Sequence, residues 1–153
     1  MAASATPING SNVIIRISSD AGSTYDIFGF ATSATLSLNM DTRDVTSKQD
    51  CGWRALKGGM KSWSLSGDGF LTYLQVAGEI EQTTLTTALF DRAELLVDFT
   101  TWDCENDTII AGDANFSGSV LVTSYEITGG VEDNATYSFT FEGTGALTEG
   151  VNP

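Results

Sequence analysis

Apolar and polar positions alternate along two stretches in the first half of the chain. Between Ala34 and Met40 every second residue is apolar, and the pattern returns between Lys61 and Asp68 around Trp63 and Leu65. A period of two places successive side chains on opposite faces of a β-strand. The pattern therefore predicts two half-buried strands, each with an apolar face and a face of short polar side chains.

Similar runs, bounded by glycine-containing turns, predict further strands over residues 13–17, 25–30, 94–100, 108–111, 116–128 and 136–142. Between Val122 and Tyr125 the alternation changes phase, which predicts a bulge. Helical spacing of apolar residues predicts one short helix over Thr84–Ala93, with Thr83 or Thr84 as its N-cap. The fold expected is mainly β, an antiparallel β-sandwich or barrel with one short α-helix and a long inter-strand loop.

The long loop joins the first two strands over residues 41–59, nineteen residues in all. Loops of this length inside a compact domain are usually functional or disordered. Apolar residues such as Val45, Trp53 and Leu56 argue against disorder and favour a segment that docks onto a partner. We expect a single domain over residues 1–153, with an N-terminal arm at 1–11, the docking loop at 41–59 and a C-terminal tail at 148–153.

Charge separates this loop from the rest of the chain. The net charge is −13, yet residues 43–61 hold five basic residues against two acidic ones, a net charge of +3. Complementary potentials of this kind set the register between partners, and the acidic partner can be another copy of the chain. The alternative is that the charges only keep the protein soluble. The docking residues expected in the loop are Arg43, Lys48, Trp53, Arg54 and Lys57.

Few catalytic or ligand-binding patterns are present in the sequence. The chain has no histidine, no C-x-x-C pair, no G-x-S-x-G and no phosphate-binding glycine loop. The acidic run 103–107 lacks the glycine and the final glutamate of an EF-hand, and is interpreted as a solvated turn. We expect no cofactor, no metal and no enzymatic activity, and two cysteines, Cys51 and Cys104, that do not form a disulfide framework.

Two other function classes remain open from the residues alone. A monomeric β-sandwich that binds carbohydrate would need Trp53, Trp63 and Trp102 to form an exposed platform, whereas Trp63 lies on the apolar face of its strand. A hydrolase would need a carboxylate pair, for which Asp41 and Asp44 are the candidates, but an ion pair or solvent exposure suits them better. Stacking of a nucleobase on Trp53 is disfavoured because the acidic body repels nucleic acid.

No run of apolar residues approaches the length of a membrane span, and residues 1–12 have neither the basic start nor the apolar core of a signal peptide. We therefore expect a protein that is made and kept in a reducing cytoplasm and has no membrane partner.

The segment SATLSLNMDTRDVTSKQDCGWRALKGGMKSWSLSGDG resembles the signature of bacteriophage major tail tube proteins of the long, non-contractile type. The segment LVTSYEITGGVEDNATYSFTFEGTGAL is similar to the end of that family. The matching stretches cover residues 34–69 and 121–147. The resemblance implies a β-sandwich subunit that closes into six-membered rings, which stack into the virion tail tube. Tail proteins at the tube ends are then further partners, and assembly takes place in the host cytoplasm. Gene transfer agents and contractile tubes use similar subunits, so a role in either of these assemblies remains an alternative.

For such a tube, the polar strand faces are candidates for the lining of the channel. Short hydroxyls in an acidic field give the phosphates of double-stranded DNA no cation to bind, so DNA passes without specific binding. The expected lumen-facing residues are Thr35, Ser37, Asn39, Ser62, Ser64, Ser66, Thr136, Ser138, Thr140 and Glu142.

Overall fold

Antiparallel strands build most of the chain in the computed structural model, which describes residues 5–18, 20–28, 31–72 and 79–153. In chain order the elements are η1 (Gly10–Asn12), β1 (Val13–Ser18), β2 (Asp26–Ile27), β3 (Ala31–Asp44), η2 (Lys48–Asp50), β4 (Leu56–Phe70), α1 (Gln82–Asp91), β5 (Glu94–Asp103), β6 (Thr108–Ile109), β7 (Ala114–Thr128) and β8 (Thr136–Val151). The mainly β fold with one short α-helix among the described residues confirms the expected class.

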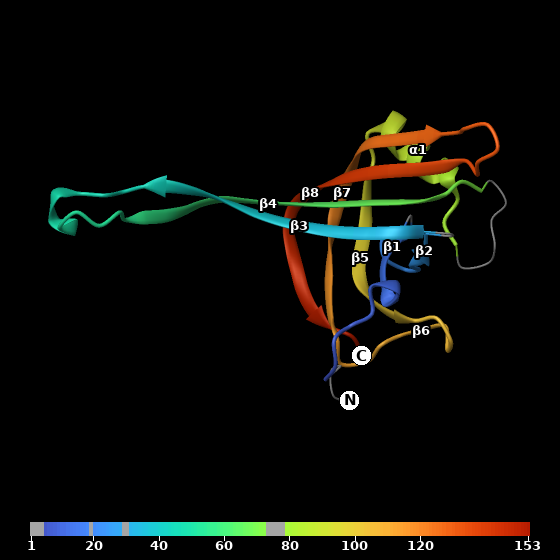
Figure 1. Ribbon diagram of the computed structural model, residues 1–153, viewed down its shortest axis with the longest axis horizontal. Coiled ribbons are helices and arrows are strands. Elements are labelled where there is room, and N and C mark those ends of the chain that lie inside the picture. Colours follow the sequence, from blue (N-terminus) through green and yellow to red (C-terminus); the bar gives the residue numbers. More distant parts are fainter. Residues whose placement is uncertain (1–4, 19, 29–30, 73–78) are drawn as a thin grey trace.

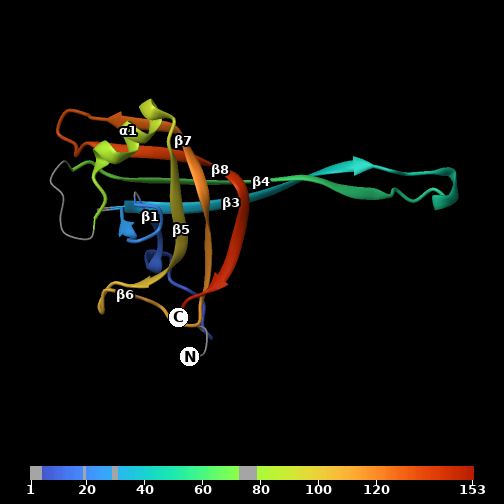
Figure 2. The same ribbon diagram turned by 180° about the vertical axis from the view of Figure 1, so that it is seen from behind.

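The strands form one bent sheet in the order β2-β1-β5-β7-β8-β4-β3, with β6 paired to β5, and each strand pairing is antiparallel. The long strands β7 and β8 bend, so that β3 and β4 run across the direction of β5 (Figure 1, Figure 2). The ladder between β7 and β8 shifts register between Val122 and Ser124. This shift confirms the bulge that the change of phase predicts.

The core is one cluster of buried side chains from β1, β4, β5, β7 and β8 and from α1. Trp63 and Leu65 from β4 meet Phe139 and Phe141 from β8, and the ring of Phe28 stacks on Phe139 with centroids 4.6 Å apart. Leu85 and Ala88 of α1 complete this cluster. Trp63 is therefore a core residue, as its place in the alternation indicates.

The helix lies two residues earlier than predicted. It begins after Glu81 rather than after Thr83 or Thr84, and it ends at Asp91, followed by the C-cap residue Arg92 with a left-handed φ of 54°. Gln82, in the first turn, is buried and accepts a hydrogen bond from the hydroxyl of Tyr125 at 2.8 Å. This contact with β7 explains the earlier start, because tertiary packing outweighs the propensity of the threonines.

The loop between β3 and β4 is shorter than the predicted range 41–59, so that prediction is wrong in its length. The β3–β4 ladder continues through the pairs Thr42 with Gly58 and Asp44 with Leu56, after a register shift beyond Met40. The segment outside the ladder is residues 45–55, with a further backbone bond from Val45 N–H to the carbonyl of Ala55. Ladder hydrogen bonds do not depend on apolar alternation, which stops where the hairpin leaves the core.

The expected tail at 148–153 is mostly strand. Residues 148–151 of β8 pair with residues 114–117 of β7, and the side chain of Asn152 is buried at 3% exposure. Of the expected N-terminal arm, residues 1–4 lie outside the described residues, and residues 5–11 are exposed. In the described part of the chain, no helix is long and apolar enough to span a membrane.

Candidate functional site

All ten residues expected to line a channel come together on one face of three neighbouring strands. In an antiparallel sheet, directly opposed residues point to the same side. The ladder joins Thr35 to Ser66, Ser37 to Ser64 and Asn39 to Ser62 across β3 and β4. It also joins Ser64 to Glu142, Ser66 to Thr140, Asp68 to Ser138 and Phe70 to Thr136 across β4 and β8. We call this surface the polar face.

The polar face continues onto β7, which contributes none of the ten residues expected from the sequence. Here Leu121 is opposite Glu142, Ser124 opposite Thr140 and Glu126 opposite Ser138. The hydroxyl of Ser138 donates to the carboxylate of Glu126 at 3.5 Å. The bulge at Val122 hides the alternation of β7, so its polar side chains give only a weak signal in the sequence.

The charges on this face have one sign. Asp68, Glu126 and Glu142 supply three carboxylates, and residues 31–39, 62–70, 121–128 and 136–142 contain no lysine or arginine. Asp68 accepts a hydrogen bond from the Ser33 hydroxyl at 3.1 Å. The surface is thus acidic and lined by short polar groups, and it offers no cation to a phosphate.

The sheet segment behind the polar face has two unpaired edges. Among the described strands, β3 pairs with β4 alone. The ladder between β5 and β7 ends at Leu121, so within the described residues the segment 122–128 of β7 has β8 as its only strand partner. Unpaired strand edges present free backbone N–H and C=O groups to another chain. The two edges bound the set β7-β8-β4-β3 on opposite sides.

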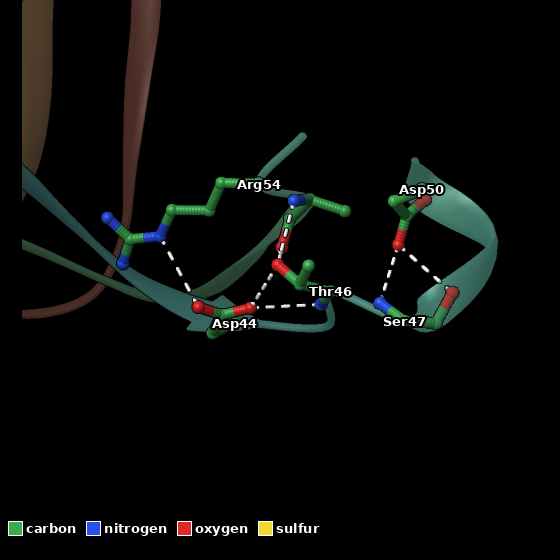
Figure 3. A network of polar contacts seen from close by, with 6 residues as sticks. Asp44, Thr46, Ser47, Asp50 and Arg54 are labelled. Carbon is green, nitrogen blue, oxygen red and sulfur yellow. Dashed lines mark hydrogen bonds and ion pairs between the residues drawn. The ribbon is translucent and has the colours of Figure 1, made fainter. Parts of the chain in front are cut away.

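The second surface is the hairpin that projects far from the body (Figure 1). We call its paired segments 41–44 and 56–59 together with residues 45–55 the arm, and residues 45–55 the tip. The tip is organised by its own polar contacts, which Figure 3 shows. Asp44 accepts from the backbone N–H of Thr46 at 2.9 Å, from its hydroxyl at 2.5 Å and from Arg54 Nε at 3.3 Å.

A second carboxylate orders the end of the tip. Asp50 accepts from the backbone N–H and the hydroxyl of Ser47, at 2.6 and 3.0 Å. The chain then turns through Cys51 and Gly52, both with positive φ, and the N–H of Trp53 donates to the carbonyl of Asp50 at 2.9 Å. The hydrogen bonds from Thr46, with a smaller contribution from Arg54, hold the pKa of Asp44 below its ordinary value. These contacts favour one tip conformation before any partner arrives.

The arm displays the five residues expected to dock. Trp53 is 81% exposed, and Lys48 and Arg54 are exposed on the same tip. Arg43 and Lys57 are opposed directly across the ladder. Like charges in this position destabilise a sheet pair. A nearby acidic surface would relieve that repulsion.

The other function classes gain no support from the geometry. Trp63 is 6% exposed and belongs to the core, so the three tryptophans do not share a platform. Asp44 is engaged with Thr46 and Arg54, and the carboxylate of Asp103 accepts from Asn106 within the acidic turn at 2.6 Å. Cys51 and Cys104 are exposed free thiols. Among the described residues, no group of three or more acidic or cysteine side chains could hold a metal ion.

A family model described as phage tail tube protein matches residues 7–149 of the chain. No curated protein sequence matches the chain.

Solved structures with the same fold include the tail of an empty gene transfer agent particle refined with C6 symmetry. That similarity has a TM-score of 0.74 at 22% identity, and it covers 93% of this chain and 98% of the other. The SPP1 tail tube matches with a TM-score of 0.71 at 18% identity, over 95% of this chain and 80% of that one. A chain in the sheath–tube complex of an extracellular contractile injection system matches with a TM-score of 0.66 at 11% identity, covering 96% and 93%.

Proposed function

The chain belongs to the phage tail tube protein family, and we propose that six copies close into a ring and that such rings stack into the tube of a virion tail. The observation that carries this proposal is the polar face, whose ten expected residues share one side of β3, β4 and β8 between two unpaired edges. The C6 symmetry of the similar gene transfer agent tail supports the six-fold ring.

The free edges suggest how the ring closes. The outer edge of β3 in one copy pairs with residues 122–128 of β7 in the next, which extends the set β7-β8-β4-β3 from subunit to subunit. A head-to-tail contact of this kind generates a closed ring when the rotation between copies is suitable. The same pairing removes both exposed edges, which would otherwise favour aggregation.

The polar face then lines the channel. Its hydroxyls and its carboxylates Asp68, Glu126 and Glu142 face double-stranded DNA that passes through during ejection. With no lysine or arginine in these strand segments, counterion release gives the wall no affinity for phosphate. The subunit is a structural protein without catalytic role, assembled in the host cytoplasm and completed by other tail proteins at the tube ends.

The arm makes the contact between rings. It is the basic part of an acidic chain, and the opposed cations Arg43 and Lys57 favour an acidic neighbour. Contacts along the tube axis do not close, so they yield a filament of stacked rings.

Negative-stain electron microscopy of the purified protein over a series of concentrations and salt conditions tests this function. We expect rings or hollow tubes whose end views average with six-fold symmetry. A protein that sediments as a monomer at every concentration and salt condition would contradict the proposal. Particles with solid rather than hollow end views would contradict the channel.

A further inference from the structure

A groove lies at the root of the arm, where β3 and β4 leave the body beside the lower part of β8. Its volume is about 470 Å³, and its apolar walls come from Leu38, Met40, Trp63, Phe116 and Leu147, with one acidic and one basic residue, Glu149 and Lys61, also in the lining. Leu38 is 59% exposed and Met40 53% exposed. Large apolar side chains gathered in one open groove are typical of a binding surface.

The groove is built by a local irregularity of β8. The β7–β8 ladder shifts register between Ser117 and Ser119, which leaves residues 145–147 of β8 outside the regular pairing. Gly145 has a φ of 79°, and its carbonyl accepts a hydrogen bond from Trp63 Nε1 at 3.1 Å. This bond ties the β8 wall of the groove to the indole at its base. A pre-formed groove of this kind loses little entropy when it is occupied.

The tip offers a side chain of the matching kind. Trp53 is 81% exposed, although the tip around it is ordered by Asp44 and Asp50. A rigidly held, exposed tryptophan is the typical anchor of a protein interface. Lys48 and Arg54 of the same tip are opposite in charge to Glu149, which lines the groove together with one cation, Lys61.

One chain cannot bring these two parts together, because the groove residues lie where β3 and β4 leave the body, whereas the tip, which contains Trp53, is at the far end of the projecting hairpin (Figure 1). Two copies can bring them together, because one copy supplies the anchor and the other supplies the groove. Such a contact is head-to-tail: the copy that gives its tip keeps a free groove, and the copy that receives it keeps a free tip, so the contact repeats without end.

We propose that the tip of one subunit inserts Trp53 into the root groove of a subunit in the next ring. This inference rests on the proposed function, and it names the receiving surface for the arm. Glu149 then pairs with a cation of the incoming tip, and Leu38 and Met40 of the receiving subunit become covered.

The native Cys51 of the tip allows a direct test by cross-linking. In a Cys104→Ser background, Ala146→Cys places a second thiol on the wall of the groove, and Thr87→Cys places one on the exposed side of α1 as a control. Assembled tubes are treated with a short bismaleimide and analysed under denaturing conditions. We expect a ladder of covalent multimers for Ala146→Cys and almost none for Thr87→Cys. Intact tubes with no ladder, or equal ladders for both variants, would overturn the inference while leaving the tube function standing.

The anchor itself is tested by Trp53→Ala, with Val131→Ala as a control because Val131 is also an exposed apolar residue. We expect rings to persist while the concentration needed for tubes rises about thirtyfold, equivalent to about 2 kcal/mol. Trp53→Phe should form tubes at a concentration between those of the wild type and of Trp53→Ala. Tube formation by Trp53→Ala at the wild-type concentration would contradict the role of Trp53. If the wild-type protein forms neither rings nor tubes, the proposed function itself fails.

Discussion

The indole of Trp63 occupies the space that a side chain on Gly143 would need. A Cβ built on residue 143 would lie 2.0 Å from Cε2 of Trp63, and one on Gly118 would lie 2.6 Å from its Cζ2. Trp63 can therefore pack deep against β7 and β8 only because both facing residues are glycines. This packing joins the root of the arm to the body of the subunit.

Gly143→Ala should consequently destabilise the fold. Overpacking of a filled core costs about 1–3 kcal/mol, since the tryptophan or the backbone must shift. Urea denaturation followed by far-UV circular dichroism measures the change in the free energy of unfolding. Gly129→Ala is the matched control because nothing lies within 4 Å of its added Cβ. Equal stability of the two variants would contradict the close packing of Trp63.

The buried Asn152 fastens the end of β8 to the body. Its Nδ2 donates to the carbonyl of Ile110 at 2.9 Å, and the hydroxyl of Thr100 donates to its Oδ1 at 3.0 Å. Asn152→Ala leaves these buried partners unsatisfied, which costs about 1–3 kcal/mol. We expect a lower thermal midpoint and faster amide exchange over residues 148–151.

Val151→Thr serves as the control for Asn152→Ala, because Val151 is exposed and threonine keeps its β-branched shape. It should leave the thermal midpoint nearly unchanged. Slow exchange over residues 148–151 in Asn152→Ala would show that the ladder with β7 holds this segment without the asparagine.

Asp20 should give the turn after β1 a pH dependence. Hydrogen bonds from the hydroxyls of Ser18 and Thr24, and from the backbone N–H of Thr24, lower the pKa of Asp20 from 3.8 to about 2. A lowered pKa means that the stabilisation is complete above pH 3.8 and is lost as the pH falls toward 2.

The Asp20→Asn variant should therefore be less stable than the wild type at neutral pH, and the difference should shrink between about pH 4 and pH 2. Denaturant unfolding at a series of pH values measures this difference, and a carboxyl NMR titration gives the pKa directly. A titration midpoint at the ordinary value would contradict the hydrogen bonds.

Reversal of charge on the arm should weaken the stacking of rings. In the triple variant Arg43→Glu, Lys48→Glu and Lys57→Glu, the arm repels the acidic body of a neighbour. We expect a folded subunit, by circular dichroism, whose tubes dissociate at lower salt than those of the wild type. Arg92→Glu is the control because Arg92 is an exposed cation outside the arm. Triple-variant tubes with normal salt resistance would refute the role of the arm charges.

Lysines on the polar face should retard DNA. Ser64→Lys combined with Thr140→Lys places cations where the wild type has hydroxyls, so the wall gains affinity for phosphate. We expect tubes to form while DNA ejection from assembled particles slows or stops. Ser64→Gln with Thr140→Gln adds length without charge and should eject DNA more nearly as the wild type does. Unchanged kinetics in the lysine variant would argue against a lumenal position for this face.

Two aspartates of the arm, Asp44 and Asp50, make contacts that the sequence did not predict. The basic residues and Trp53 stand out in the sequence because their chemistry is unusual there, so the sequence already predicts a docking role for the arm. The roles of Asp44 and Asp50 depend on which backbone N–H groups the folded tip brings to them. Similarly, the groove requires Leu38, Phe116 and Leu147 to meet from three strands, and no local pattern indicates that meeting.

The sequence by itself determined the strands and the side to which each residue points, because alternation with a period of two is a local property of the backbone. It thereby identified the polar residues of β3, β4 and β8 and the core position of Trp63. Tertiary structure alone decided that these strands are neighbours, that the hairpin ladder extends to Asp44 and Leu56, and that residues 148–151 pair with β7. Strand pairing depends on packing and hydrogen bonding between residues that are far apart in the chain. Such long-range interactions leave no periodic signal in the sequence of either strand.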